Sequence, residues 1–530
     1  MSSTTLARST VRQLIEIGVC DFVLSPGSRN APLSIALFEA EGAGLINLYV
    51  RIDERGAAFF ALGLSKASDT YVAVICTSGT AAANFHPAAL EAYHSANKLL
   101  VITADRPAAL RRTGANQTTL QVGILAPIES VDVAIPIDIS EVLSTGPIHL
   151  NMQFDEPLLS GDHKEWLAGL TPRPLTLENI ANMSPEDSDK PGVKLNCAPH
   201  GVLIVGHDRA GITPQEITAF AQKLGWPLVA EDPLSFPSAI PHAALFLSDN
   251  EIRGVLKSEQ IIVIGRASLS RSVNTFIKEC VELVVIDSRV ISVDTERKAQ
   301  RFFSHLPSVQ VNVDSSWIRK WQEISDLAQN TVQLDWSEQS VVRAISANLP
   351  DGSAFFVGSS RPVRDIEAFA RPRTGVTTFA NRGLAGIDGN ISCAFGIAEK
   401  FERTYALLGD LTFLHDISAL VNPSNANLTI FVIDNNGGGI FNTLPQASVD
   451  GFEKIFGTAH NLDIVKVIQG FGLNVQKVKS DSDLLHLIRH QTLGLNFVVI
   501  AVPNRTINAE KLKEVTQSLV NAVRIGNNLA

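Results

Sequence analysis

Short runs of β-branched and aliphatic residues recur along the chain, and helical patterns fill the intervals between them. In the N-terminal part these runs are DFVL (21–24), YVAVIC (71–76) and LLVIT (99–103). Apolar strands that alternate with helices are typical of parallel βαβ units, because helices cover both faces of a parallel sheet. The alternation therefore predicts an α/β fold built on doubly wound parallel sheets.

The same alternation appears twice more along the chain. A second block contains GVLIVG (201–206), IIVIG (261–265) and ELVVID (282–287), and a third contains YALLG (405–409) and LTIFVID (428–434). A chain of 530 residues is too long for a single hydrophobic core. We therefore expect three doubly wound parallel-sheet domains in series.

The domain boundaries are predicted from changes in composition. A stretch that includes TPRPL and SPEDSDKPG is rich in proline and polar residues, which predicts an interdomain linker. A helical segment that contains tryptophan separates the second block from the third. The predicted organisation is an N-terminal domain over residues 1–170, a linker over 171–199, a central domain over 200–335 and a C-terminal domain over 336–530.

Composition and charge argue against several classes of protein. Hydrophobic residues make up 45% of the chain and charged residues 18%, which is typical of a folded α/β protein. A formal net charge of -10 argues against broad binding to nucleic acid or acidic membranes, because such partners need a basic face. The five cysteines include no CxxC pair, and no apolar run is long enough to span a bilayer. We expect reduced thiols and a cytoplasmic protein.

The strongest local signal lies in the third block, where polar residues follow two strands. Asp410 follows YALLG, and Asn435 opens the turn NNGGG after LTIFVID. The interval between them suits one strand–helix–strand crossover, which places both residues at the same edge of a parallel sheet. Carboxylate, amide and main-chain carbonyl oxygens suit Mg²⁺ bound to a phosphorylated ligand. The alternative is that Asp410 caps a helix beginning near Thr412 and that the asparagines form a simple turn.

Another acidic position follows a predicted strand over residues 45–50. The segment RIDERGAA places Asp53, Glu54 and Arg55 before small residues, where a helix could bury a carboxylate. Burial would raise the pKa of Glu54. The alternative is that these residues form the polar first turn of a helix, where acids interact favourably with the helix dipole.

Several arginines lie in turns directly after predicted strands, where doubly wound sheets bind their ligands. They are Arg29, Arg106, Arg364 and Arg382. Arginine suits carboxylates because its planar guanidinium presents two parallel donors. If all four faced one pocket, the substrates together would carry several carboxylates. Each arginine taken alone is more often a solvated or structural ion pair.

Seven motifs occur in order along the chain: SPGSRNAPL, IDERGAAFFALG, TSGTAAANFHPA, TADRP, GANQT, NRGLAGIDG and NNGGGIF. Together they resemble the MenD family, the 2-succinyl-5-enolpyruvyl-6-hydroxy-3-cyclohexene-1-carboxylate synthases of menaquinone biosynthesis. The resemblance implies the thiamine diphosphate-binding fold. It also implies decarboxylation of 2-oxoglutarate and conjugate addition of the succinic-semialdehyde carbanion to isochorismate, with release of CO2.

The resemblance assigns a cofactor site that is shared between domains. Thiamine diphosphate would be activated by Glu54, and Ile387 would brace it between its rings. Asp410, Asn435 and the Gly437 carbonyl would bind Mg²⁺ or Mn²⁺. The remaining members of the cofactor pocket would be Ile440 and Phe441. In such enzymes the cofactor usually lies between two subunits, so the expected assembly is a homodimer or a dimer of dimers.

The resemblance also assigns residues to the two small-molecule substrates. Gln117 and Arg382 would act close to the reacting atoms, beside the catalytic Glu54. The full substrate-binding set would be Ser28, Arg29, Arg106, Asn116, Gln117, Arg271, Ser360, Arg364 and Arg382. His86 and His94 are interpreted as structural, because the cofactor itself supplies both electron sink and base.

Two other functions stay open at this point. An acetolactate-synthase-like carboligase would share Glu54 and the metal motif, but it needs an apolar acceptor pocket, and the arginines argue against one. A non-catalytic nucleotide-binding protein with three Rossmann-like domains would need a GxGxxG motif followed at the required distance by an acidic residue. The sequence contains no convincing example.

Overall fold

Two compact units make up the chain, and each is built from several chain segments. The first comprises Met1–Pro185, Gly383–Glu402 and Leu414–Ala426, and the second comprises Glu186–Arg382, Arg403–Phe413 and Asn427–Ala530. The computed structural model describes residues 2–143, 145–159, 165–171, 194–289, 294, 297–490 and 492–529. Most of the predicted linker lies outside these ranges. The predicted boundaries follow chain order, whereas two segments of the predicted C-terminal domain pack within the first unit.

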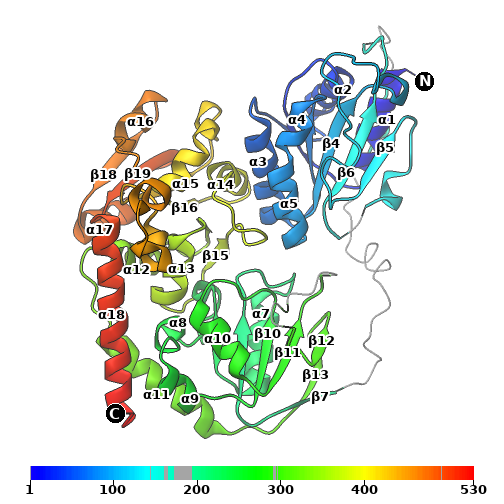
Figure 1. Cartoon of the computed structure of the whole chain (residues 1–530). Coiled ribbons are helices and arrows are strands. Elements are labelled where there is room, and N and C mark those ends of the chain that lie inside the picture. Colours follow the sequence, from blue (N-terminus) through cyan, green and yellow to red (C-terminus); the bar gives the residue numbers. More distant parts are fainter. Residues whose placement is uncertain are drawn as a thin grey trace. The chain divides into compact units, whose positions relative to one another are not determined.

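The first unit contains a parallel sheet with the strand order β2-β1-β3-β4-β6-β5 in the described residues. Figure 1 labels β4, β6 and β5 of this sheet. Its central strands β3 and β4 are fully buried and largely apolar, as expected for a sheet covered on both faces. The strands are β1 (Asp21–Leu24), β2 (Asn47–Val50), β3 (Val72–Cys76), β4 (Leu99–Asp105), β5 (Ser130–Val133) and β6 (Ile148–Gln153). Every neighbouring pair is parallel.

Helices cover both faces of this sheet. α1 (Ser3–Glu16) and α2 (Ala31–Gly42) pack Leu14 and Leu37 into one core with Phe22 of β1. The helices that follow β2 and β3 are α3 (Glu54–Ser68), α4 (Thr80–Asn84) and α5 (His86–Ser95). The shorter turns of this unit are η1 (Ala108–Leu110), η2 (Ile139–Glu141) and η5 (Ile417–Val421).

Helix α14 (Asn390–Ala398) packs closely against α3. A Cβ atom on Gly63 of α3 would lie 2.1 Å from the carbonyl oxygen of Cys393. A Cβ atom on Gly396 of α14 would lie 2.1 Å from the carbonyl oxygen of Phe60. The two helices therefore approach through glycines, which explains how a distant segment of the chain joins the first unit.

The second unit contains two further parallel sheets in the part of the chain that the structure describes. The central one has the order β12-β11-β10-β8-β9, with a short β13-β7 pair, and the C-terminal one has the order β15-β14-β16-β17-β19-β18. The predicted α/β fold with parallel sheets in series is thereby confirmed. The central strands are β7 (Lys194–Cys197), β8 (Gly201–Val205), β9 (Leu228–Ala230), β10 (Gln260–Ile264), β11 (Glu282–Ile286), β12 (Arg301–Phe303) and β13 (Ser308–Val311).

The C-terminal sheet begins after a long helical segment. Its strands are β14 (Ser353–Val357), β15 (Val376–Phe379), β16 (Thr404–Gly409), β17 (Leu428–Asp434), β18 (Val475–Val478) and β19 (Leu495–Ala501). Its helices and turns are α12 (Glu338–Asn348), α13 (Arg361–Phe369), α15 (Asp410–His415), η6 (Gly439–Thr443), η7 (Pro445–Ser448), η8 (Glu453–Gly457), α16 (Ile464–Gly470), α17 (Asp481–Arg489) and α18 (Arg505–Gly526).

A shared core joins the two sheets of the second unit. Trp321 of α11 (Ser315–Thr331) is fully buried with Leu519 and Val523 of α18. Trp317 ties α11 to the central sheet, because its Nε1 donates to the Gly201 carbonyl at 2.8 Å. The helices and turns of the central sheet are α7 (Pro214–Leu224), η4 (Pro233–Ser235), α8 (Ala243–Phe246), α9 (Asn250–Val255) and α10 (Arg271–Glu279). Among the described helices, none is both long and apolar enough to cross a bilayer.

Candidate active site

Asp410 and Asn435 lie close together at one edge of the C-terminal sheet. Asp410 begins α15 directly after β16, and Asn435 follows β17. The two strands are parallel neighbours, so both residues emerge at the same edge. The Gly437 main-chain N–H donates to Asp410 Oδ2 at 2.9 Å and to Asn435 Oδ1 at 3.1 Å. A carboxylate oxygen and an amide oxygen therefore converge on one point. The helix starts at Asp410 itself and not near Thr412.

The turn after Asn435 requires glycine at one position. Gly437 has φ +135°, and a Cβ atom there would lie 2.3 Å from the Gly457 carbonyl oxygen. Only glycine tolerates both the backbone conformation and the close approach. The turn thus places main-chain groups directly beside the two oxygen ligands. This arrangement suits a hard divalent cation that also binds phosphate.

A buried carboxylate orients the Asn435 amide. Asn435 Nδ2 donates to Glu338 Oε1, which leaves Asn435 Oδ1 on the side of Gly437 and Asp410. Glu338 is 3% exposed at the start of α12. Burial, with the nearby Asp365 carboxylate, raises the pKa of Glu338 to about 7. Glu338 was not identified from the sequence, because it lies far from the NNGGG motif in the chain.

Two further side chains lie beside Asp410. His460 Nε2 lies 3.2 Å from Asp410 Oδ2, and this hydrogen bond raises the pKa of His460. Burial and the Asp410 charge raise the pKa of Asp434. One ligand atom from each of Asp410, Asp434 and His460 falls within 4.8 Å of the others. His460 was not predicted from the sequence, because it does not lie in a recognisable motif.

Glu54 begins α3 in the first unit, directly after the N-cap residue Asp53. Asp53 Oδ1 accepts a hydrogen bond from the Arg55 main-chain N–H at 3.1 Å, so Asp53 caps the helix. The helix is otherwise deeply buried from Gly56 to Ser65. Glu54 itself is half-buried, so the predicted burial of its carboxylate is met only in part. Its place in the first turn leaves one side open to solvent.

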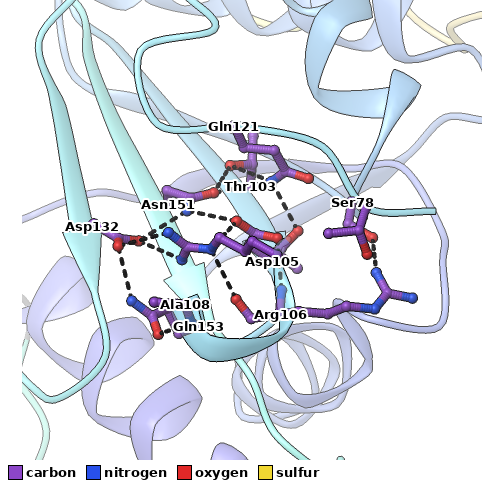
Figure 2. Close-up of polar contacts among 12 residues, drawn as sticks. Ser78, Thr103, Asp105, Arg106, Ala108, Gln121, Asp132, Asn151 and Gln153 are labelled. Atoms are coloured by element: carbon purple, nitrogen blue, oxygen red, sulfur yellow. Dashed lines mark hydrogen bonds and ion pairs between the residues drawn. The ribbon is translucent and has the colours of Figure 1, made fainter. Parts of the chain in front are cut away.

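Arg106, Gln117 and Ser78 form a compact hydrogen-bonded group in the first unit. Arg106 Nη1 donates to Gln117 O at 2.9 Å and to Ser78 Oγ at 3.2 Å, as Figure 2 shows in part. Gln117 Nε2 donates to Ser78 O, and Ser78 Oγ donates back to Gln117 O, both at 2.9 Å. Gln117 has φ 55°, a conformation that costs energy and often marks a functional position. Two predicted substrate residues are thus brought together.

Arg29 lies near this group and carries the same charge. Its Nη1 donates to Phe154 O at 3.1 Å and lies 3.4 Å from Glu156 Oε1. Burial, and then the Arg29 charge, lower the pKa of Arg106. Like charges at short range are unfavourable unless an anion lies between them. The Glu156 carboxylate offsets part of this repulsion, because it lies beside Arg29 and raises the pKa of Arg106.

Arg364 and Arg382 form a second pair of arginines, in the second unit. Arg382 is 6% exposed, and its Nη2 donates to Ser268 Oγ at 3.0 Å. Burial and the Arg382 charge lower the pKa of Arg364, whose Nη1 donates to Ser360 O at 2.7 Å. Burial and the neighbouring Glu231 carboxylate raise the pKa of Glu367 well above its usual range. Glu231 and Glu367 are thus the acidic groups that face this pair of arginines.

The other predicted residues divide between the units. Ser28 and Asn116 are exposed in the first unit, and Ile387 is half-buried there. Ile440 and Phe441 lie in η6 of the second unit, where the Phe441 ring is 5.4 Å from the Phe456 ring. The second unit also contains two other predicted substrate-binding residues: Ser360, which has φ 76°, and Arg271, which is exposed at the start of α10.

Comparison with known proteins identifies the family. The thiamine pyrophosphate enzyme models match in chain order: the N-terminal TPP binding domain over residues 4–124, the middle domain over 173–357 and the C-terminal TPP binding domain over 359–502. A 2-succinyl-5-enolpyruvyl-6-hydroxy-3-cyclohexene-1-carboxylate synthase from Nocardioides sp. is 37% identical over 97% of this chain and 98% of the relative. The synthase from Thermobifida fusca is 34% identical over 98% of this chain and 100% of the relative. The chain belongs to this synthase family.

The family assignment decides between the alternatives that the sequence left open. Another synthase of the same name, from Corynebacterium diphtheriae, is 32% identical over 97% of this chain. The synthase family uses thiamine diphosphate, so a non-catalytic Rossmann-like protein is excluded. The match over almost the whole chain favours the synthase over an acetolactate-synthase-like carboligase.

A polar network behind Arg106 and Gln117 was not predicted for this synthase. Gln121 is fully buried, accepts from the Gly79 N–H at 2.8 Å and donates to Asn151 Oδ1 at 3.0 Å (Figure 2). Asn151 in turn donates to Asp105 Oδ2 at 3.0 Å. Arg111 Nε lies 2.8 Å from the same Asp105 oxygen. These contacts fix the strand ends that carry the Arg106 group. The one sequence signal for such a network is that the motifs TADRP and GANQT lie close together in the chain.

Proposed function

We propose that the chain decarboxylates 2-oxoglutarate with thiamine diphosphate and adds the resulting succinic-semialdehyde carbanion to isochorismate. The products are 2-succinyl-5-enolpyruvyl-6-hydroxy-3-cyclohexene-1-carboxylate and CO2. Within the family assignment, the observation that carries this proposal is the placement of four arginines whose guanidinium groups are held by neighbouring oxygen atoms: Arg29 and Arg106 in the first unit, and Arg364 and Arg382 in the second. Both substrates are dicarboxylates, and arginine is the side chain best suited to bind carboxylates.

The oxygen atoms at the edge of the C-terminal sheet support a metal site for the diphosphate. Asp410, Asn435 Oδ1 and the Gly437 carbonyl would bind Mg²⁺ or Mn²⁺. The fit rests on two hard oxygen atoms that both accept a hydrogen bond from the Gly437 N–H, in a turn that requires glycine at this position. Thiamine diphosphate, when bound, supplies the electron sink for decarboxylation. Glu338 would keep the Asn435 oxygen directed at the metal.

The protein side chains would bind and orient the reactants. Glu54 would hydrogen-bond the pyrimidine ring of the cofactor, and its half-buried position in the first turn of α3 leaves its carboxylate accessible to that ring. Ile387 would brace the cofactor, while Ile440 and Phe441 would line its pocket. The substrate-binding set would be Ser28, Arg29, Arg106, Asn116, Gln117, Arg271, Ser360, Arg364 and Arg382. Among these, Gln117 and Arg382 would lie nearest the reacting atoms.

The proposed assembly is a homodimer or a dimer of dimers, and the proposed location is the cytoplasm. Both stay predictions. Sedimentation of the purified protein with and without thiamine diphosphate measures the first directly.

The reaction itself is tested with purified protein, thiamine diphosphate and Mg²⁺. Loss of isochorismate absorbance and release of CO2 are followed with 2-oxoglutarate, with pyruvate in its place, and with each component omitted. We expect isochorismate to disappear only in the complete mixture that contains 2-oxoglutarate. CO2 release without isochorismate consumption, or activity only with pyruvate, would overturn the assignment of the acceptor or of the donor.

A further inference from the structure

Glu91 is a buried carboxylate that the proposed reaction does not use. It lies on α5, is 3% exposed, and accepts hydrogen bonds from three consecutive main-chain N–H groups of a distant segment. Its Oε1 accepts from Gly383 at 2.7 Å, and its Oε2 accepts from Leu384 at 2.7 Å and from Ala385 at 3.4 Å. Consecutive N–H groups that converge on one anion form a well-defined recognition geometry. All four residues belong to the first unit.

The segment is shaped to fit this carboxylate. A Cβ atom on Gly383 would lie 2.5 Å from the Glu91 carbonyl oxygen and 3.1 Å from its carboxyl group. Ala385 has φ 61°, a left-handed conformation that is unfavourable for alanine without support from its surroundings. Lys66 Nζ of α3 lies 3.9 Å from Glu91 Oε1 and balances its charge. The contacts therefore hold the segment in a conformation that it would not prefer alone.

The anchored segment leads directly to a residue of the proposed cofactor site. Ile387 follows Ala385 by two residues in NRGLAGIDG, and α14 begins shortly afterwards at Asn390. The position of Ile387 is thus set on one side by the bonds to Glu91 and on the other by the packing of α14 against α3. Loss of the hydrogen bonds to Glu91 would remove the first of these two supports of Ile387.

We propose that Glu91 is a positioning residue of the cofactor site, which holds main-chain residues 383–385 so that Ile387 is presented to thiamine diphosphate. The inference rests on the cofactor role proposed for Ile387. Glu91 does not touch the reacting atoms; it acts through the three hydrogen bonds that it accepts. A charged acceptor suits this task because hydrogen bonds to ionised groups are stronger than neutral ones.

The proposal is tested with Glu91→Ala and Glu91→Gln in the full-length protein. Hydrogen exchange of a peptide that covers residues 383–389 reports the anchor, and calorimetric titration with thiamine diphosphate in Mg²⁺ reports the cofactor site. For Glu91→Ala we expect exchange of this peptide and the cofactor Kd both to rise by about tenfold. Glu91→Gln keeps one acceptor oxygen, so both changes should be smaller. Glu399→Gln is the matched control, because Glu399 is an acid of the same unit whose carboxylate accepts a hydrogen bond from the Ser424 hydroxyl, away from residues 383–385.

Two results would overturn the proposal. One is unchanged exchange over residues 383–389 in Glu91→Ala. The other is faster exchange there with an unchanged cofactor Kd, which would make Glu91 a structural anchor alone. If Glu91→Ala does not fold, Glu91→Gln must show the same paired changes at smaller size. Neither readout requires isochorismate, so failure of the proposed reaction in the wild-type protein is distinguishable from failure of this inference.

Discussion

The Gly437 main-chain N–H donates to Asp410 Oδ2 at 2.9 Å, which joins the turn after β17 to the first residue of the helix after β16. The same N–H lies 3.1 Å from Asn435 Oδ1. A single N–H group thus holds the Asp410 and Asn435 side-chain oxygens close together, although the two oxygens repel each other. A divalent cation can take over this task, because it attracts both oxygens more strongly than a neutral N–H does. The hydrogen bonds from Gly437 hold the two proposed metal ligands near each other.

This relationship predicts that Asp410→Asn weakens binding of thiamine diphosphate and Mg²⁺ by roughly 10- to 100-fold, because a carboxylate ligand becomes a neutral amide. Calorimetric titration of the cofactor at several Mg²⁺ concentrations measures the change. Chelation of the metal with EDTA should reduce the wild-type affinity to a similar extent. Asp450→Asn, at an exposed position in the same unit, is the control. Equal Mg²⁺ dependence in Asp410→Asn and the wild type would contradict the metal site.

The sequence was sufficient to predict this edge of the sheet because strand ends are encoded locally. Apolar runs followed by Asp410 and by NNGGG predicted both the sheet and the edge at which these residues emerge, and the structure brings Asp410 and Asn435 together there. Glu338 and His460 could not be predicted in the same way. Each reaches the site from an element that is distant in sequence, and neither stands in a recognisable motif.

Domain organisation was harder to predict because compactness depends on packing between helices. The sequence analysis did not identify α14 (390–398) as part of the first unit, because its close packing against α3 depends on Gly396 and Gly63, which lie far apart in the chain. The burial of Glu54 was also difficult to predict, because it depends on packing between segments that are distant in the sequence. Small residues after Glu54 do form a buried helix, whereas the exposure of its first turn depends on neighbours that are distant in the chain.

The close approach of α3 and α14 predicts that Gly63→Ala destabilises the protein. Its Cβ atom would lie 2.1 Å from the Cys393 carbonyl oxygen, so the helices must separate at a cost of about 1–3 kcal/mol. Gly42→Ala is the matched control, because Gly42 ends α2 and a methyl group there would have no heavy atom within 4 Å. This control should be neutral or more stable by up to about 1 kcal/mol. Chemical denaturation of both variants measures the free energy of unfolding; similar values for the two would refute the close contact.

Arg106→Gln should impair binding of a dicarboxylate substrate without affecting the cofactor. The substitution removes a guanidinium that lies near Arg29, so the site loses much of its attraction for an anion. We expect the KM of one substrate to rise by about 10- to 100-fold, with the cofactor Kd unchanged. Steady-state kinetics with each substrate varied in turn identifies which one Arg106 binds. Arg112→Gln, an exposed arginine nearby in the chain, should leave both KM values unaltered.

His149 predicts a dependence of stability on pH in the first unit. Its ring is fully buried between Thr103 Oγ1 at 2.7 Å and Ser130 Oγ at 2.9 Å, and burial lowers its pKa from 6.5 to about 4. The unfolded chain therefore binds more protons at this residue than the folded chain between pH 4 and 6.5. The contribution of His149 to stability is complete above pH 6.5. As the pH falls toward 4 it is lost at up to about 1.4 kcal/mol per pH unit.

A second buried group in the same unit acts in the opposite direction, so the test must isolate His149. Burial raises the pKa of Asp416 from 3.8 to about 6, and the stability that its protonated form contributes is lost as the pH rises through that range. The informative quantity is the difference in unfolding free energy between the wild type and His149→Gln, measured by denaturation at pH 7.5, 6, 5 and 4. Because glutamine does not titrate, this difference should shrink steadily below pH 6.5. A difference that stays constant across the series would show that His149 is not held neutral by its buried hydrogen bonds.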